Sequence, residues 1–131
     1  MVYRILVVDD EGPIREILDE VLHRVDAGIR VDLADDGGML VDYAGKRPYD
    51  LIIADWDMPG MTGVDAVRAL RQGRGPNRHT PVFMMTGIVK GWEDRVREAH
   101  KAGANSIIRK PFDNGKFMGE VRRYMQDQGR A

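Results

Sequence analysis

Five short apolar runs spaced along the chain constrain the fold more than any other feature. Several of them are apolar throughout instead of alternating with polar residues, which is the pattern expected where both faces of a parallel sheet are covered. We therefore predict five strands. They cover Tyr3–Val8 (YRILVV), Arg30–Ala34 (RVDLA), Asp50–Ala54 (DLIIA), Pro81–Met85 (PVFMM) and Ser106–Arg109 (SIIR).

Apolar residues at helical spacing follow each of these runs and predict five helices. The clearest helix begins at Pro13, a residue suited to a first helical turn, and closes near Gly28. This alternation predicts a doubly wound α/β sheet with helices on both faces, in one domain covering residues 1–131. The later helices are marked by Leu40, Tyr43 and Ala44; by Val64, Val67 and Leu70; by Val96, Ala99 and Ala102; and by Phe117, Val121 and Tyr124.

Composition narrows the classes of function. The formal net charge of −1 over 131 residues leaves no global basic footprint, so we expect no nucleic-acid partner. No stretch approaches the ~20 apolar residues of a membrane span, so we expect no membrane association either. The absence of cysteine excludes disulfides and thiolate metal sites and agrees with a reducing compartment. We predict a soluble cytoplasmic protein.

Polar residues gather where the predicted strands end. The stretch LIIAD delivers Asp55 to the end of an apolar run, where a carboxylate is costly unless it is paired or coordinated. Sheets of this class bind ligands outside the carboxyl ends of their strands, so residues at those ends are the candidate site. They are Asp9, Asp10, Asp55, Thr86 and Lys110.

This set of residues predicts a metal and phosphoryl site. If the first strand lies between the second and third, Asp9, Asp10 and Asp55 share one pocket, where they repel one another unless a cation sits among them. Oxygen ligands alone suit Mg²⁺. Lys110 offers a positive charge and Thr86 a hydroxyl donor, which would suit the oxygens of a phosphoryl group on Asp55. Taken singly, each of these residues is compatible with a turn, a helix cap or a solvated side chain.

At these positions the chain resembles the receiver domain of bacterial two-component response regulators, in particular the chemotaxis-type single-domain regulators. The motifs are VVDDE with Asp9 and Asp10, DWDMPGMTG with Asp55, MMTG with Thr86, and RKPF with Lys110 and Pro111. They occur in the family's order and spacing and span nearly the whole chain. The resemblance implies a flavodoxin-like receiver fold with strand order 2-1-3-4-5.

The resemblance also implies a function. Asp55 would take a phosphoryl group from the phosphohistidine of a sensor histidine kinase or phosphotransfer protein, and the resulting change of conformation would be read by a downstream protein. Mg²⁺ would be held by Asp10, Asp55 and the backbone carbonyl of Asp57, with Asp9 acting mainly through a metal-bound water. A cis peptide bond before Pro111 is implied as well.

One departure from the family pattern affects the expected output surface. The family often carries an aromatic residue three positions before the lysine, and Ile107 stands there. Output would then rely on Thr86, the loop after it and motion of the fourth helix. Asp57 and Ile88 occupy positions that tune dephosphorylation in the family. The expected switch and partner surface comprises Gly87, Ile88, Trp92, Ile107 and Lys116, although Trp92 is equally compatible with a core role.

Two other functions compete with this one. Asp55-Trp56-Asp57 satisfies the DxD pair of a haloacid-dehalogenase-type phosphatase, but that family continues to a Thr or Val where Pro59 stands, places DxD after its first strand and uses a longer chain. A flavodoxin-like FMN binder would need a Ser/Thr-rich phosphate loop after the first strand, where this chain has two acids. A truncated piece of a longer regulator would have the same sequence features as a single-domain one.

Overall fold

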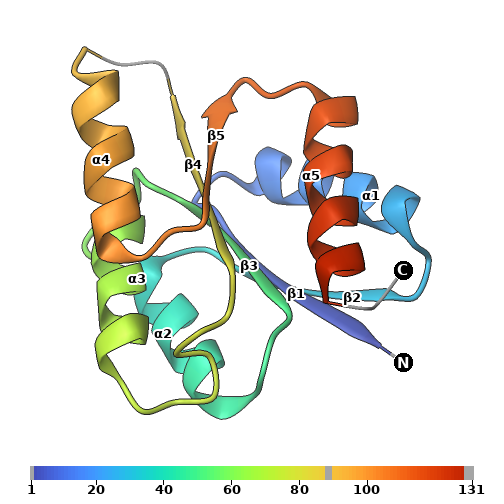
Figure 1. Ribbon diagram of the computed structural model, residues 1–131, viewed down its shortest axis with the longest axis horizontal. Helices are drawn as coiled ribbons and strands as arrows, with labels where there is room; N and C mark the ends of the chain where they lie inside the picture. The colour runs from blue at the N-terminus through green and yellow to red at the C-terminus, as the bar shows by residue number, and fades with distance from the viewer. Residues whose placement is uncertain (1, 88–89, 129–131) are drawn as a thin grey trace.

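The computed structural model describes residues 2–87 and 90–128, and strands and helices alternate along them (Figure 1). The strand predictions are confirmed, with ends that move by one or two residues. The strands are β1 (Tyr3–Val8), β2 (Ile29–Ala34), β3 (Leu51–Asp55), β4 (Val82–Gly87) and β5 (Ser106–Lys110). The helices are α1 (Gly12–Val25), α2 (Gly37–Lys46), α3 (Gly63–Gln72), α4 (Trp92–Ala102) and α5 (Asn114–Asp127).

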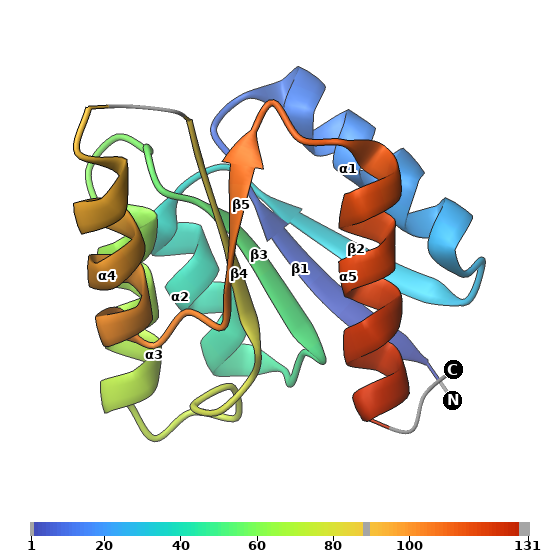
Figure 2. The same cartoon turned by 45° about the horizontal axis from the view of Figure 1, so that its top comes forward.

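All strand pairs in the sheet are parallel, and the strand order is β2-β1-β3-β4-β5. Helices cover both faces, with α1 and α5 together on one side and α2, α3 and α4 on the other (Figures 1 and 2). The predicted doubly wound α/β fold is therefore confirmed. Since β1 lies between β2 and β3, the condition for a shared pocket at their carboxyl ends is met.

Successive strand residues enter two separate cores. Leu6, Ile52 and Met84 pack against the layer of α2, α3 and α4, while Ile5 and Phe83 pack against α1 and α5. All five side chains are fully buried. Two covered faces explain why the strands are apolar without alternation.

Three strands extend further at their carboxyl ends than the sequence suggested. The predicted runs ended at Ala54, Met85 and Arg109, whereas β3 includes Asp55, β4 includes Thr86 and Gly87, and β5 includes Lys110. Asp55 is still in register with Met85, and the next amide, that of Trp56, donates to the Met85 carbonyl at 2.8 Å. Backbone pairing thus fixes the polar residues at the strand ends.

The ends of helix α4 are set by glycines. Gly91 precedes the helix and Gly103 follows it, with φ angles of 83° and 113°, a region that glycine enters without steric cost. The cis peptide bond that the resemblance implied before Pro111 is confirmed, between Lys110 and Pro111. In the part of the chain that the structure describes, no helix has the length and apolar content needed to cross a bilayer.

Candidate functional site

The carboxyl ends of β1 and β3 bring Asp9 and Asp55 side by side. Val8 is in register with Ala54, so the residues that follow them leave adjacent strands at the same level. Asp9 is fully buried and Asp55 is 4% exposed, while Asp10 is exposed. One carboxylate oxygen from each of the three lies within 4.8 Å of the others, as the sequence predicted.

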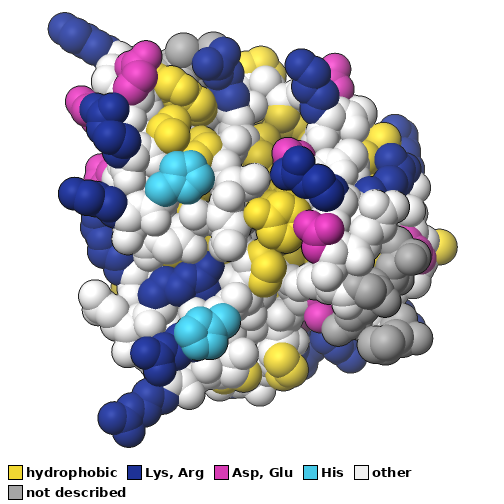
Figure 3. All heavy atoms as spheres, in the orientation of Figure 1, with side chains coloured by type: hydrophobic (Ala, Val, Ile, Leu, Met, Phe, Trp, Pro, Cys, Tyr) yellow, Lys and Arg dark blue, Asp and Glu magenta, His cyan; other side chains and the backbone are white. Residues whose placement is uncertain are grey.

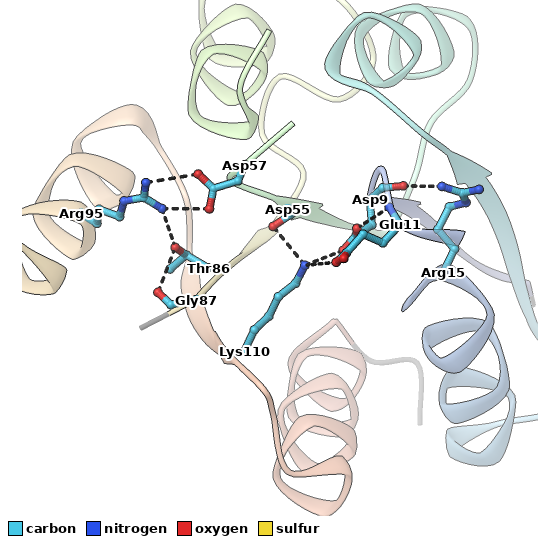
Figure 4. Close-up of polar contacts among 9 residues, drawn as sticks. All are labelled: Asp9, Glu11, Arg15, Asp55, Asp57, Thr86, Gly87, Arg95 and Lys110. Atoms are coloured by element: carbon cyan, nitrogen blue, oxygen red, sulfur yellow. Dashed lines mark hydrogen bonds and ion pairs between the residues drawn. The ribbon is translucent and has the colours of Figure 1, made fainter. Parts of the chain in front are cut away.

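Lys110 is the counter-ion of the two buried acids (Figure 4). Its Nζ lies 2.8 Å from Asp9 Oδ2, 3.2 Å from Asp55 Oδ1 and 3.8 Å from Glu11 Oε2. Burial by itself lowers the pKa of Lys110, but the hydrogen bond to Asp9 and the charges of Asp55 and Asp9 outweigh it and raise the pKa. The ammonium group therefore stays charged at neutral pH.

The surroundings of Asp55 disfavour the charged form of its carboxyl group. Burial, followed by repulsion from Asp9, raises its pKa from 3.8 to about 6, and the charge and hydrogen bond of Lys110 together with the Asp57 amide oppose that rise. At neutral pH the Asp55 side chain is ionised in most molecules, so an oxygen lone pair is available for nucleophilic attack.

Asp10 and Asp55 border a hollow of about 340 Å³ at the surface. One positive charge from Lys110 does not balance the acids around it, so the hollow can accept a cation. Its dimensions also leave space for a small anionic group beside Asp55. The lining residues are Asp10, Glu11, Asp55, Asp57, Gly87 and Lys110.

The backbone close to Asp9 and Asp55 is fixed by neighbouring groups. The Glu11 amide donates to Asp9 Oδ1 at 2.9 Å, and Arg15 Nη1 donates to the Asp9 carbonyl at 2.6 Å. At Gly63, the first residue of α3, a Cβ atom would come within 2.2 Å of the Asp55 carbonyl oxygen. Glycine at this position permits the close approach of helix and strand.

Thr86 is fully buried, and its hydroxyl faces helix α4. Thr86 Oγ1 accepts a hydrogen bond of 2.8 Å from Arg95 Nη1 and donates a long one, 3.4 Å, to the Gly87 carbonyl. Among the hydrogen bonds of the described residues, none joins Thr86 Oγ1 to Asp55 or Lys110. The predicted switch hydroxyl therefore borders the acid cluster without being bonded to it (Figure 4).

Arg95 is a site residue that the sequence did not reveal. Its guanidinium makes two contacts with the Asp57 carboxylate, at 3.1 and 3.2 Å, and stacks on Trp56 with 4.8 Å between Cζ and the ring centroid. In the sequence Arg95 stands among the charged residues of a helix, which is typical of a solvated face. Its contacts with Thr86 and Asp57 form only once α4 is packed onto the sheet.

The predicted partner surface divides among three environments. Gly87 lines the acidic hollow, whereas Ile107 and Lys116 line a second hollow of about 420 Å³ between β5 and α5. Trp92 is half-buried, with the Arg109 guanidinium 4.9 Å from its ring centroid. Ile88 lies outside the residues that the structure describes.

One face of the molecule, seen in Figure 3, carries patches of mixed character. Arginine and lysine side chains project from its edges, and apolar side chains emerge between them without merging into one broad area. Within the described residues, the large apolar side chains that are most exposed are Val2, Ile17, Leu33 and Met61, which lie far apart in the sequence.

A parallel sheet whose carboxyl ends carry buried acids beside a strand-end lysine defines a class of phosphoryl-accepting signalling domains, and the comparisons with known proteins agree with this class. Residues 5–122 match the family model described as the response regulator receiver domain. The chain belongs to this family. The match also decides against the phosphatase and FMN-binder alternatives, and Asp55 lies at the end of the third strand instead of after the first.

Individual relatives lead to the same family. Chemotaxis protein CheY of Pseudomonas aeruginosa is 38% identical over 110 residues, which are 83% of this chain and 85% of the relative. The solved structure of CheY4 from Vibrio cholerae is 31% identical, with a TM-score of 0.83 over 95% of this chain and 99% of that one. The receiver domain of sensor histidine kinase PA1611 from Pseudomonas aeruginosa, solved with a magnesium ion coordinated in its active-site cleft, is 25% identical with a TM-score of 0.81, over 96% and 99% of the two chains.

Proposed function

We propose that residues 1–131 form one receiver domain in which Asp55 is the phosphoacceptor of a two-component phosphorelay. The observation that carries this proposal is the position of Asp55, a buried carboxylate between Asp9 and Lys110 that borders an open hollow. A carboxylate so placed is ionised, oriented and reachable from outside. These are the requirements of a nucleophile.

The reaction transfers one phosphoryl group. An Asp55 oxygen attacks the phosphorus of a phosphohistidine, an acyl phosphate bond forms, and the P–N bond breaks with its electron pair returning to the imidazole. Lys110 Nζ, 3.2 Å from Asp55 Oδ1, lies where it would neutralise charge on the phosphoryl oxygens. Thr86 would supply a hydroxyl to the same oxygens after moving from its present partners.

The donor set fits Mg²⁺. Three carboxylate oxygens within 4.8 Å of one another, one of them from an exposed residue, are hard ligands that leave room for water and phosphate oxygens. Asp10, Asp55 and the backbone carbonyl of Asp57 would hold the ion, and Asp9 would contact it through a water. The bound cation would supply charge neutralisation between the acids and the incoming phosphoryl group.

The phosphorylated domain acts as a switch that catalyses its own phosphorylation and dephosphorylation, not the turnover of a separate substrate. Its phosphoryl donor is a sensor histidine kinase or a phosphotransfer protein, and its output is a protein target in the cytoplasm. The target would contact α4, β5 and α5, where Trp92, Ile107 and Lys116 lie. Gly87 would transmit the movement of Thr86, and Ile88 is assigned to the same surface from its position in the sequence.

Incubation with acetyl phosphate and Mg²⁺, followed by intact-mass measurement, tests the assignment. The wild-type protein should gain one phosphoryl group, and Asp55→Asn should gain none. Asp57→Asn is the matched control, since it keeps the backbone carbonyl and should still be phosphorylated. An adduct of unchanged stoichiometry on Asp55→Asn, or steady hydrolysis of a generic phosphatase substrate, would contradict the proposal.

A further inference from the structure

Arg95 connects three parts of the molecule that the proposed switch would have to move relative to one another. From the first turn of α4 its guanidinium reaches Thr86 on β4 and both carboxylate oxygens of Asp57 in the loop after β3. The Arg95 side chain is 26% exposed and the Asp57 side chain 58%. A forked guanidinium held by a carboxylate in this way is confined in both position and orientation.

The contact with Thr86 opposes the movement that phosphorylation requires. Thr86 Oγ1 lies 2.8 Å from Arg95 Nη1, so the hydroxyl cannot approach a phosphoryl group on Asp55 unless this bond lengthens or Arg95 leaves Asp57. Both changes sacrifice a charge-assisted hydrogen bond, and such bonds are stronger than neutral ones. The free energy of the lost hydrogen bond therefore destabilises only the state in which Thr86 binds the phosphoryl group.

The same side chain ties α4 to the loop of the acceptor. Arg95 covers the indole of Trp56, which is 7% exposed and directly follows Asp55. Ile107 has neither ring nor hydroxyl, and it packs against the core on the side of α2, α3 and α4. Among the residues that the structure describes, Arg95 is thus the polar side chain that joins helix α4 to both Thr86 and the acceptor loop.

We propose that Arg95 is a positioning residue that latches the unphosphorylated state by holding Thr86 away from Asp55 and α4 against the acceptor loop. This inference rests on the proposed function of Asp55. Phosphorylation releases the latch, because Thr86 leaves Arg95, and α4 then loses one of its attachments to the site. The strength of the contacts around Arg95 sets the balance between the two states.

Titration with beryllofluoride in the presence of Mg²⁺ tests the latch, with the fluorine NMR signal of the bound probe as the readout. Arg95→Ala should reach half-saturation at a concentration about five- to tenfold lower than the wild-type protein, because the bound state no longer has to break the contact. Amide exchange in α4 of the free variant should rise toward the rate seen in the wild-type protein with the probe bound. A variant that was merely damaged would bind the probe more weakly.

Three further variants define the contribution of each contact. Arg95→Lys cannot reach Thr86 and both Asp57 oxygens at once, so its half-saturation should lie between those of Arg95→Ala and the wild-type protein. Asp57→Asn frees the guanidinium from its ion pair and should shift binding in the same direction. Arg97→Ala is the control, since Arg97 lies on the same helix with an exposed side chain paired to Asp94, and it should bind the probe as the wild-type protein does.

The outcomes separate the latch from the function on which it rests. Unchanged or weaker probe binding by Arg95→Ala, with normal binding by the wild-type protein, overturns the latch and leaves Asp55 as phosphoacceptor. If the wild-type protein binds no probe and acquires no phosphoryl group from acetyl phosphate, the proposed function fails and the latch falls with it.

Discussion

Lys110 Nζ lies 2.8 Å from Asp9 Oδ2, although the two residues are 101 positions apart in the chain. Asp9 directly follows β1 and Lys110 ends β5, and these two strands are not neighbours, since β3 and β4 lie between them. This ion pair therefore spans the carboxyl ends of β3 and β4, and it forms only when β1, β3, β4 and β5 have come together. A change at this site should consequently alter the free energy of unfolding of the whole domain.

Removal of the Lys110 ammonium should destabilise the protein. Lys110→Met would leave Asp9 and Asp55 buried without their counter-ion, and breaking a buried pair from one side costs about 3–5 kcal/mol. We expect the free energy of unfolding in urea to fall by roughly this amount in the absence of divalent ions. Lys46→Ala removes an exposed pair with Asp42 and should change the free energy of unfolding by less than about 1 kcal/mol. Equal effects of the two substitutions would contradict this account.

The carboxyl group of Asp55 should make the metal-free protein less stable as the pH rises. Its pKa is about 6 in the folded protein against 3.8 ordinarily, so between these values the folded state binds more protons than the unfolded state. The contribution of Asp55 therefore becomes unfavourable between pH 4 and pH 6, by a total of about 3 kcal/mol.

Asp55→Asn measures this contribution directly. The variant should exceed the wild-type free energy of unfolding at pH 7 to 8 without Mg²⁺, and the difference should shrink as the pH approaches 4. Urea unfolding of both proteins across this range provides the measurement. A difference that stays constant with pH would mean that Asp55 does not titrate as stated.

The core and the acid cluster could be predicted from the sequence because each depends on strand order. The continuous apolar runs indicated a sheet covered on both faces, and residues after parallel strands meet at one edge. Asp9, Asp55 and Lys110 lie together for that reason. The motifs that contain them also carried the resemblance to the receiver family.

Arg95 and Gly63 could not be predicted in this way. Their roles depend on how helices pack on the sheet, which fixes the 2.8 Å contact of Arg95 with Thr86 and the space of less than a methyl group at Gly63. A charged residue within a helix and a glycine after a turn are ordinary sequence features with many possible roles. The predicted end of the fourth strand was likewise short, because the apolar run stops at Met85 whereas the backbone pairing continues through Thr86 and Gly87.

Mg²⁺ should stabilise the folded protein. An ion that binds only the folded state raises the free energy of unfolding by about 2.7 kcal/mol at a concentration one hundred times its dissociation constant. We expect a Mg²⁺-dependent rise in melting temperature that is much reduced in Asp10→Asn. Asp42→Asn, which changes an exposed acid on α2, should keep the full rise.

Calcium provides a second check on the metal site. Its larger radius and preference for more ligands make it a poorer fit to a site that must hold phosphate oxygens in fixed positions. It should therefore support phosphorylation by acetyl phosphate less well than Mg²⁺. A melting temperature indifferent to Mg²⁺, or equal phosphorylation with both ions, would count against the proposed ligands.

Gly63→Ala should damage both stability and phosphorylation, because the added methyl group would come within 2.2 Å of the Asp55 carbonyl oxygen and 3.0 Å of Met84 Sδ. The conflict is with backbone, so helix α3 or the end of β3 must shift, and overpacking of this kind costs about 1–3 kcal/mol. Displacement of Asp55 should also slow its phosphorylation by acetyl phosphate.

Gly119→Ala is the matched control: it makes the same substitution in helix α5, where nothing lies within 4 Å of the added atom. There the better helix propensity of alanine should raise stability by about 0.5–1 kcal/mol and leave phosphorylation unchanged. Urea unfolding measures the change in stability, and intact-mass measurement over time gives the rate of phosphorylation. If Gly63→Ala behaved like Gly119→Ala in both, the close packing of α3 on the acceptor strand would be wrong.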